Sequence, residues 1–494
     1  MSDISNWPFA AVLVANRGEI ALRILRTVRA LGLKGLVVFH AADRDSPAVR
    51  AADEAIEIHG TTPVAAYLDG AQIVAAAVAA GAGAIHPGYG FLSENAAFAR
   101  AVATAGMVFV GPTPEQIDLM GDKVRARAFV AAGGFPVAPS AIEDDDPASF
   151  VARAAEVGFP LLIKPAAGGG GKGMRIVRER GALESEIERA RSEGQRYFGD
   201  GRLYVERYVE APRHIEVQVL GDAHGNLVHL FERECSVQRR FQKIVEESPS
   251  PALDAEARAR ICETAAGIAR AAGYCNAGTV EFIFGDGVFY FLEMNTRLQV
   301  EHPVTEMITG IDLVREQLRV AAGEALGFAQ ADVLTKGHAI EFRIYAEDPA
   351  RGYAPTTGPV LALRLPPGVR VDSGIAQGSA VTAAFDPMLA KLIVHGADRA
   401  AAMARADAAL ADFVLLGCDT NIAFLRRLLA HPMFVAGEVH TGFLDANPAI
   451  AEAPELPADQ VAGLLAVAAL ITRPVRDAAD AVPALHAAMG AWRN

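Results

Sequence analysis

The sequence predicts an α/β protein of about three domains that begins with a parallel sheet covered by helices. Its 494 residues exceed what one hydrophobic core usually spans, because a domain typically holds about 150 residues. Hydrophobic residues make up 51% of the chain and charged residues 21%, a globular composition that excludes wholesale disorder. Strand-like and helix-like segments alternate from the N-terminus onward, which is typical of α/β proteins.

The N-terminal region has the order strand, helix, strand. Residues 10–16 form an apolar β-like run, residues 20–31 repeat apolar side chains at helical spacing, and residues 33–39 form a second apolar run. The alternation continues through an Ala-rich helix at 71–80 to a strand at 107–110. The turn after the first strand contains one glycine, whereas dinucleotide binding requires Gly-x-Gly-x-x-Gly, so we assign no nucleotide to it.

The remaining chain is predicted to combine short strands, glycine loops and helices. A helix is expected over 254–272, with Asp254 as its N-cap. Further predictions are strands at 339–345, 359–365 and 389–395, a helix at 398–412, and a helical apolar stretch at 460–472.

Charge and cysteine content exclude several classes of protein. The net charge of −13 argues against a surface that binds nucleic acid, so any anionic ligand requires a local basic site. The 4 cysteines contain no Cys-x-x-Cys pair, which favours a reducing cytosol over a disulfide framework or a zinc ribbon. The first ten residues do not resemble a secretory signal, and Pro87 and several glycines interrupt the uncharged run 70–93. We therefore expect a soluble cytoplasmic protein without a membrane span.

A glycine-rich loop at 168–173 lies between predicted strands at 159–165 and 174–177. Glycines at this density allow backbone N–H groups to approach phosphate oxygens closely. The loop is not a Walker P-loop, because a strand follows it and no Ser or Thr follows Lys172. The glycines alone favour a flexible turn, since glycine-rich loops are often simple connections. Lys164 before the loop and Lys172 within it favour a phosphate-binding flap instead.

Two carboxylates are expected to face each other on a predicted hairpin of 279–284 and 288–295. If the connection has three residues, Glu281 lies on the same face as Glu293, one diagonal step away; a two-residue turn would place them on opposite faces. Polar residues then recur at every second position from Glu293 to Glu301. Carboxylates this close repel unless they share a cation, and such hard ligands suit Mg²⁺ or Mn²⁺ bound with phosphates. The alternative is a solvated sheet face.

Five motifs follow one another along the chain. They are ANRGEIA at 15–21, HPGYGFLSEN at 86–95, GGGGKGM at 168–174, ERECSVQRR at 232–240 and EMNTRLQVEH at 293–302. Together they resemble biotin carboxylase, the ATP-grasp component of biotin-dependent carboxylases, over residues 8–446. The resemblance implies a Rossmann-like N-terminal domain over 1–120, an ATP-grasp domain over 121–330 with its lid at 138–208, a C-terminal α+β domain over 331–446, and an Ala/Pro-rich tail over 447–494.

The resemblance also implies an ATP site, a Mg²⁺ site and a biotin contact. The residues implied to contact or lie near the nucleotide are Lys123, Lys164, Glu206, His214, Gln238 and the flap glycines Gly168, Gly169, Gly170, Gly171 and Gly173. The implied metal ligands are Glu281 and Glu293, with Asn295 beside them, and Tyr89 corresponds to a contact on the biotin side. From the residues alone, Lys123 is equally an ordinary helix-surface lysine and Tyr89 a packing residue.

A bicarbonate pocket and two reactive groups complete the site that the resemblance implies. Lys243, Arg297, Gln299 and the Val300 backbone match the pocket, Glu301 matches the general base, and Arg343 matches the residue that steadies the biotin enolate. These residue types suit the chemistry. A carboxylate helps bicarbonate to attack the γ-phosphate, and a guanidinium stabilises an oxyanion.

The chain contains no Met-Lys-Met sequence, which is the family's usual biotin attachment site. The resemblance therefore implies that biotin is held by a separate carrier protein and that a carboxyltransferase subunit selects the final acyl acceptor. A homodimer or a larger carboxylase complex is expected. The ending at Asn494 is interpreted as that of a naturally short subunit or of a truncated chain.

Some residues depart from the family pattern. Phe241 stands where many relatives have a polar residue near the nucleotide, and Phe385 replaces a common tyrosine. Glu19 and Arg23 have the spacing of a helix-surface ion pair. Two other functions remain open: another ATP-grasp ligase, such as a carbamoyl-phosphate or carboxylate–amine ligase, and a catalytically silent scaffold subunit.

Overall fold

The computed structural model describes residues 4–143, 146–165, 174–240, 242–453 and 457–480. The chain divides into one compact unit of residues 1–450 and a second unit of residues 451–494. The second unit contains α17 (Ala458–Asp480), in agreement with the helical stretch predicted at 460–472. Within the described residues, no helix combines the length and apolar content that crossing a membrane requires.

The N-terminal part is a parallel five-stranded sheet with the strand order β3-β2-β1-β4-β5, as the sequence predicts. One hydrophobic core lies against each face of this sheet, because the strands contribute apolar side chains to both. Its elements are β1 (Ala11–Val14), α1 (Gly18–Ala30), β2 (Lys34–Phe39), α2 (Pro47–Ala51), β3 (Glu54–Glu57), α3 (Pro63–Leu68), α4 (Gly70–Ala79), β4 (Ala84–His86), α5 (Ala96–Thr104), β5 (Val108–Phe109) and α6 (Pro114–Gly121).

The middle of the chain begins with α7 and a small four-stranded sheet of order β6-β9-β7-β8, which has its own core. The predicted strands on either side of the glycine loop are β7 and β8, and they pair antiparallel. The glycine loop itself, residues 168–173, lies outside the described residues. The elements are α7 (Lys123–Ala132), β6 (Ser140–Ile142), α8 (Phe150–Glu156), β7 (Leu161–Pro165), β8 (Arg175–Val177), α9 (Leu183–Phe198) and β9 (Leu203–Arg207).

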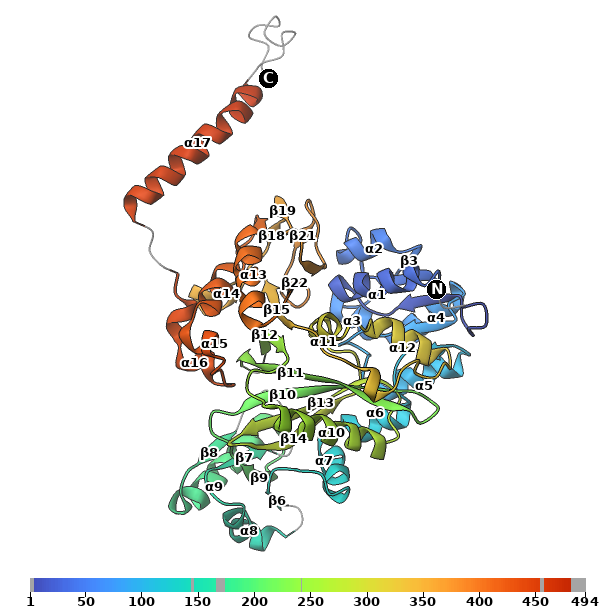
Figure 1. Ribbon diagram of the computed structural model, residues 1–494, viewed down its shortest axis with the longest axis vertical. Coiled ribbons are helices and arrows are strands. Elements are labelled where there is room, and N and C mark those ends of the chain that lie inside the picture. The colour runs from blue at the N-terminus through green and yellow to red at the C-terminus, as the bar shows by residue number, and fades with distance from the viewer. Residues whose placement is uncertain (1–3, 144–145, 166–173, 241, 454–456, 481–494) are drawn as a thin grey trace, which may run out of the picture. The chain divides into compact units, whose positions relative to one another are not determined.

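A second sheet of eight strands, ordered β14-β13-β10-β11-β12-β15-β22-β20, continues from the middle of the chain into its C-terminal part (Figure 1). The pairing of β12 with β15 joins the two parts, since Val245 faces Phe342 in an antiparallel ladder. The remaining middle elements are β10 (Arg213–Gly221), β11 (Leu227–Arg239), β12 (Gln242–Ser248), α10 (Ala255–Ala271), β13 (Asn276–Gly285), β14 (Val288–Asn295), α11 (His302–Thr309) and α12 (Leu313–Ala321).

The C-terminal part adds two long strands to this sheet and packs helices beside it. The strand predicted at 359–365 is two short strands, β18 and β19, which pair with different partners. The elements are β15 (His338–Tyr345), β16 (Glu347–Asp348), β17 (Ala354–Pro355), β18 (Gly358–Pro359), β19 (Ala362–Arg364), β20 (Arg370–Ser373), β21 (Ala380–Val381), β22 (Met388–Gly396), α13 (Arg399–Asp412), β23 (Val414–Leu416), α14 (Ile422–Leu429), α15 (Pro432–Ala436) and α16 (Phe443–Ala446).

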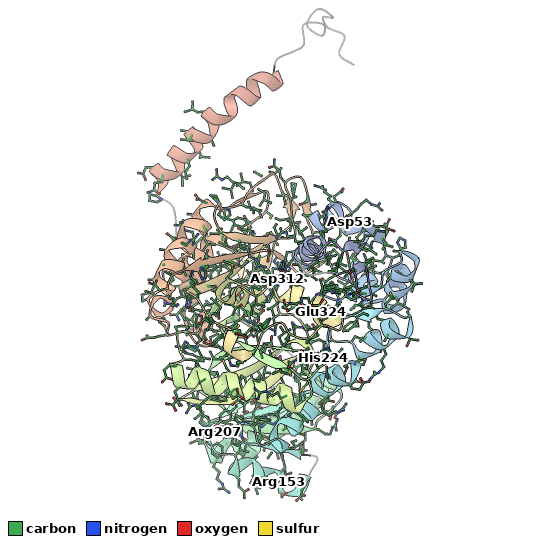
Figure 2. All side chains as sticks on the ribbon, turned by 45° about the vertical axis from the view of Figure 1, so that its right-hand side comes forward. Asp53, Arg153, Arg207, His224, Asp312 and Glu324 are labelled. Atoms are coloured by element: carbon green, nitrogen blue, oxygen red, sulfur yellow. The ribbon has the colours of Figure 1, made fainter. Side chains whose placement is uncertain are left out.

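Ion pairs of the buried Arg23 connect the N-terminal helix α1 to α11 and to the start of α12, which follow β14 in the chain. Arg23 pairs with Glu306 of α11 at 2.7 Å and with Asp312, the N-cap of α12, at 2.8 Å. Asp312 is labelled in Figure 2. The prediction that Glu19 and Arg23 form a surface ion pair is therefore wrong. Both side chains are buried, because this face of α1 packs against other parts of the chain instead of solvent.

Candidate active site

Three acidic side chains form a row across neighbouring strands at one end of the large sheet. Glu216 on β10 lies opposite Glu281 on β13, and Glu281 lies opposite Glu293 on β14. Directly opposed residues of antiparallel strands point to the same face. The sheet therefore places three carboxylates side by side, which requires cations nearby.

A β-bulge brings Glu281 and Glu293 together. The hairpin connection has two residues, Asp286 and Gly287, with φ angles of 52° and 74°, which suits a tight Asp-Gly turn. The three-residue connection considered from the sequence is not formed. The register shifts between Glu281 and Phe282, so that Leu292 is the extra residue on β14. Because of this extra residue, Glu281 and Glu293 lie on the same face of the sheet. A two-residue turn without the bulge would place them on opposite faces.

Lys243 is the cation at the centre of this row. Its Nζ lies 2.5 Å from Glu216 Oε2, 2.5 Å from Glu301 Oε1 and 3.1 Å from Glu281 Oε1. Burial disfavours the charged amine, but the surrounding carboxylates raise the pKa of Lys243 well above its ordinary value. Lys243 is therefore a permanent cation that holds three carboxylates in place.

Glu301, the predicted base, is fully buried at the end of the segment that enters α11. Arg343 Nη2 lies 3.0 Å from Glu301 Oε2, while its Nε donates to Glu246 at 2.6 Å. Burial alone would raise the pKa of Glu301, but the charges of Lys243 and Arg343 hold it below its ordinary range. Glu301 is therefore an ionised carboxylate at neutral pH, as a proton acceptor requires.

Arg297 links the polar row on β14 to the N-terminal part of the chain. It donates from Nε to Glu94 Oε2 at 2.8 Å, from Nη2 to Asn295 Oδ1 at 2.8 Å and from Nη1 to Gln299 Oε1 at 3.1 Å. Gln299 in turn donates to Glu281 at 3.0 Å. The structure thus brings together the residues that the sequence assigned to bicarbonate and metal binding.

His214 also belongs to this cluster. Its Nε2 lies 2.8 Å from Glu281 Oε2, and its backbone N–H donates to Ser236. Burial disfavours a charged imidazole, yet the adjacent Glu281 carboxylate raises the pKa of His214. The imidazole is consequently a second partner for Glu281, and the carboxylate favours its protonated form.

The lysines assigned to the nucleotide have fewer ion-pair partners than Lys243. Lys123, the first residue of α7, is 77% exposed and pairs with Glu293 Oε2 at 2.7 Å. Lys164 on β7 pairs with Glu206 on β9, and Arg127 Nη1 lies 4.0 Å from the same carboxylate. Lys123 is thus a helix residue that nevertheless reaches a predicted metal ligand.

The remaining assigned residues lie around these groups. Gln238 is buried and faces Lys243 in the β11–β12 ladder. The Val300 carbonyl accepts a hydrogen bond from Lys391 at 2.7 Å, and the Tyr89 ring centroid lies 5.9 Å from the same ammonium. Gly168, Gly169, Gly170, Gly171 and Gly173 lie outside the described residues, as does Phe241. Phe385 is described, and its ring stacks 3.7 Å from the Arg17 guanidinium carbon.

Sequence reasoning missed four side chains of the site: Glu94, Glu216, Glu246 and Lys391. Glu216 carried a signal, because His214, Glu216 and Gln218 alternate as polar residues on a strand whose residues after His214 are otherwise apolar. The others take part only through chain segments that are distant in sequence. No pattern within one segment could have identified them.

The donor set fits a hard divalent cation. Glu281 and Glu293 present carboxylate oxygens on neighbouring strands, which is the ligand type that Mg²⁺ and Mn²⁺ prefer. Asn295 Nδ2 donates to Glu281 Oε1 at 2.8 Å and so orients that ligand. Among the described residues, potential ligand atoms of His214, Glu216 and Glu281 also lie within 4.8 Å of one another, as do those of Glu216, Cys235 and Glu301.

Comparisons with known families divide the chain into three matched regions. Residues 122–329 match the carbamoyl-phosphate synthase L chain ATP-binding domain. Residues 8–117 match the biotin carboxylase N-terminal domain, and residues 341–446 match the biotin carboxylase C-terminal domain. The flanking regions therefore distinguish this chain from other proteins that share the central module.

Individual relatives agree with this division. The chain is 49% identical over 440 residues to biotin carboxylase 2 of Bacillus subtilis, covering 88% of this chain and 99% of that protein. It is 47% identical over 438 residues to the alpha subunit of the mitochondrial methylcrotonoyl-CoA carboxylase of Rattus norvegicus, covering 88% of this chain and 61% of that relative. The chain thus spans less than two thirds of the length of the rat protein.

A solved structure agrees as well. The biotin carboxylase domain of Hydrogenobacter thermophilus 2-oxoglutarate carboxylase, solved with MgADP and bicarbonate, superposes with a TM-score of 0.84 at 43% identity, covering 90% of this chain and 99% of that chain. Fold and site together define an ATP-grasp enzyme with three consecutive regions. The chain belongs to the biotin carboxylase family.

Proposed function

We propose that this protein carboxylates biotin at the expense of ATP and bicarbonate, releasing ADP and phosphate, as the first half-reaction of a biotin-dependent carboxylase. One observation carries this proposal. The ionised carboxylate of Glu301 is fixed between Lys243 at 2.5 Å and Arg343 at 3.0 Å, inside a family whose relatives are biotin carboxylases. A base and two permanent cations are what bicarbonate activation requires.

The first step joins bicarbonate to the γ-phosphoryl group. Glu301 accepts the proton of bicarbonate, an oxygen of bicarbonate attacks the γ-phosphorus, and the bond to the ADP oxygen breaks. The products are carboxyphosphate and ADP. Lys243 and Arg297 offset the negative charge of bicarbonate, although the net charge of the whole chain is −13.

The second step transfers the carboxyl group. Carboxyphosphate breaks into CO₂ and phosphate, the phosphate removes the N1′ proton of biotin, and N1′ forms the new bond to CO₂. Arg343 stabilises the ureido oxyanion, because its guanidinium remains charged throughout. Tyr89 lines the biotin side of this site.

The nucleotide is held by Lys123, Lys164, Glu206, His214 and Gln238 in this proposal, and the glycine flap covers its phosphates. Glu281 and Glu293 hold Mg²⁺, with Asn295 orienting Glu281. When bound, the cation supplies charge stabilisation to the phosphates during transfer. Its carboxylate ligands are already placed by the β13–β14 ladder.

The proposed partners follow from the relatives. Several are components of larger carboxylases, such as a pyruvate carboxylase subunit of Methanothermobacter thermautotrophicus, which is 47% identical to this chain over 442 residues. We propose that a separate carrier protein presents biotin and that a carboxyltransferase subunit receives the carboxyl group, with this chain acting as a homodimer or within a larger complex. A cytoplasmic location is proposed because all four cysteines are free thiols.

The test is ADP release by the purified chain with MgATP, with and without bicarbonate and free biotin. Turnover that requires bicarbonate and rises with biotin supports the proposal. ADP release that depends on neither would contradict it. Stimulation by ammonia or an amino acid in place of biotin would instead indicate a carbamoyl-phosphate or carboxylate–amine ligase.

A further inference from the structure

Lys391 is a fully buried lysine, 0% exposed, that the proposed reaction does not use. It lies on β22 directly opposite Arg343 on β15. Opposed residues of an antiparallel pair share one face of the sheet. Two basic side chains therefore stand side by side beneath the segment that carries Glu301.

The two basic side chains contact successive residues of that segment. Lys391 Nζ donates to the Val300 carbonyl at 2.7 Å, and Arg343 Nη2 contacts Glu301 Oε2 at 3.0 Å. Lys391 thus holds the main chain at the peptide between Val300 and Glu301, while Arg343 holds the Glu301 carboxylate. The position of the base depends on both contacts.

The segment before α11 that carries Glu301 depends on side-chain contacts, because its backbone pairs with no neighbouring strand in the described part of the chain. Residues 296–301 connect β14 to α11 and pair with no strand among the described residues. Side chains from other parts of the chain set its path, for example Glu94, which accepts from the Thr296 N–H at 3.0 Å. Lys391 performs this task at the end of the segment nearest to the base.

A counterion role for Lys391 would be the simpler explanation of its burial. Glu19 on α1 forms an ion pair with it, with Oε2 at 3.5 Å from Nζ. Burial raises the pKa of Glu19 to about 7 even though Lys391 lowers it, so Glu19 is only partly ionised at neutral pH. The shorter contact of Lys391 is the one with the Val300 carbonyl, at 2.7 Å.

We propose that Lys391 is a positioning residue for the general base. Its ammonium fixes the Val300–Glu301 peptide, and thereby the place at which the Glu301 carboxylate and the Val300 backbone meet bicarbonate. This inference rests on the proposed function, because that function assigns the base to Glu301. It predicts that loss of the ammonium impairs the use of bicarbonate without impairing the binding of ATP.

Three variants separate positioning from charge balance: Lys391→Met, Glu19→Gln and the double variant. Lys391→Met should lower kcat for bicarbonate-dependent ADP release by about 10- to 100-fold, because small displacements of catalytic groups have effects of this size. Its KM for bicarbonate should rise several-fold, while its KM for ATP stays within about twofold. Glu19→Gln should keep kcat within about threefold of the wild type, since it leaves the contact with Val300 in place.

The double variant decides between the two roles. It removes the lysine together with Glu19, the carboxylate that forms an ion pair with it, and Asp372, which faces Lys391 in the β20–β22 ladder, keeps its ion pair with Arg370. Its melting temperature should therefore recover part of the way toward that of Glu19→Gln. We expect its kcat to stay low and its KM for bicarbonate to stay high. A double variant with the kcat and both KM values of Glu19→Gln would overturn the inference, because Lys391 would then only balance Glu19.

The wild type, measured in parallel, separates this inference from the proposed function. Wild-type ADP release that does not depend on bicarbonate would contradict the proposed function itself. Wild-type dependence on bicarbonate combined with a normal double variant would contradict only the positioning role of Lys391.

Discussion

The two ends of the candidate active site are built differently. The bicarbonate end consists of Lys243, Glu301 and Arg343, whose side chains are at most 11% exposed and each contact at least two charged partners. The nucleotide end consists of Lys123 with Glu293 and Lys164 with Glu206. At the nucleotide end the Lys123 side chain is 77% exposed, whereas the Lys164 and Glu206 side chains are 16% and 17% exposed.

This difference shows which contacts are fixed before substrates bind. Charges in a buried network cannot rearrange at low cost, because each would lose its partners in a medium that solvates ions poorly. An exposed ion pair exchanges its partner for water or a ligand with little change in free energy. We infer that the bicarbonate end is preassembled and that, at the nucleotide end, the exposed Lys123 takes its final arrangement with ATP.

Replacing the base should have the largest effect. Glu301→Gln keeps the shape of the side chain but removes the proton acceptor, so we expect kcat for bicarbonate-dependent ADP release to fall by about 10²- to 10⁴-fold. Nucleotide affinity, measured by titration, should be nearly unchanged because the nucleotide end is separate. Glu54→Gln, at an exposed pair with Lys34, is the matched control. Near-normal turnover of Glu301→Gln would refute its role as base.

Removing the central cation should mainly affect stability. Lys243→Met leaves Glu216, Glu281 and Glu301 without their shared partner, and breaking a buried charge network costs about 3–5 kcal/mol. Urea unfolding should show this loss. An unfolding free energy equal to that of the wild type would contradict a preassembled bicarbonate end.

Replacing the guanidinium of Arg343 with an amine should have an intermediate effect on turnover. Arg343→Lys keeps the charge but loses the fork that contacts Glu246 and Glu301 at once. Loss of one charge-assisted hydrogen bond corresponds to about a 10- to 100-fold decrease in biotin-dependent turnover. ADP release with bicarbonate alone should decrease less. An equal decrease with and without biotin would contradict a specific role toward biotin.

The nucleotide end should respond least in stability. For Lys123→Met we expect a change in unfolding free energy within about 1 kcal/mol, as is usual for an exposed ion pair. Its KM for ATP should rise about tenfold if Lys123 contacts phosphate. A stability loss as large as that of Lys243→Met would remove the contrast between the two ends.

Local patterns were sufficient to predict most of the secondary structure. Asp254 caps α10 by accepting from the Ala257 N–H at 2.8 Å, as its place before an amphipathic run predicts. The alternation in the first forty residues predicts the parallel sheet correctly. The strand expected at 359–365 is divided instead, because the backbone changes partners after Pro359: the Val360 N–H donates to Ser379 and the Leu361 N–H donates to Leu416.

From residue patterns alone, the site was predictable only within one hairpin, and the family resemblance supplied Lys243, Glu301 and Arg343 from separate segments. The hairpin places Glu281 opposite Glu293, as the pattern suggests. It does so through a β-bulge at Leu292, which no residue pattern predicted. Glu216 and Lys391 act through strand pairing and through a contact across the fold. Such contacts are set by tertiary packing, which a pattern within one segment does not encode.

The most direct test of this account follows the oxygen atoms. The reaction is run with MgATP, biotin and ¹⁸O-labelled bicarbonate, and the released phosphate is analysed by mass spectrometry. If Glu301 activates bicarbonate for attack on the γ-phosphate, each phosphate should carry one ¹⁸O derived from bicarbonate. Phosphate whose new oxygen comes from water alone would contradict the account, because ATP would then be hydrolysed without forming carboxyphosphate.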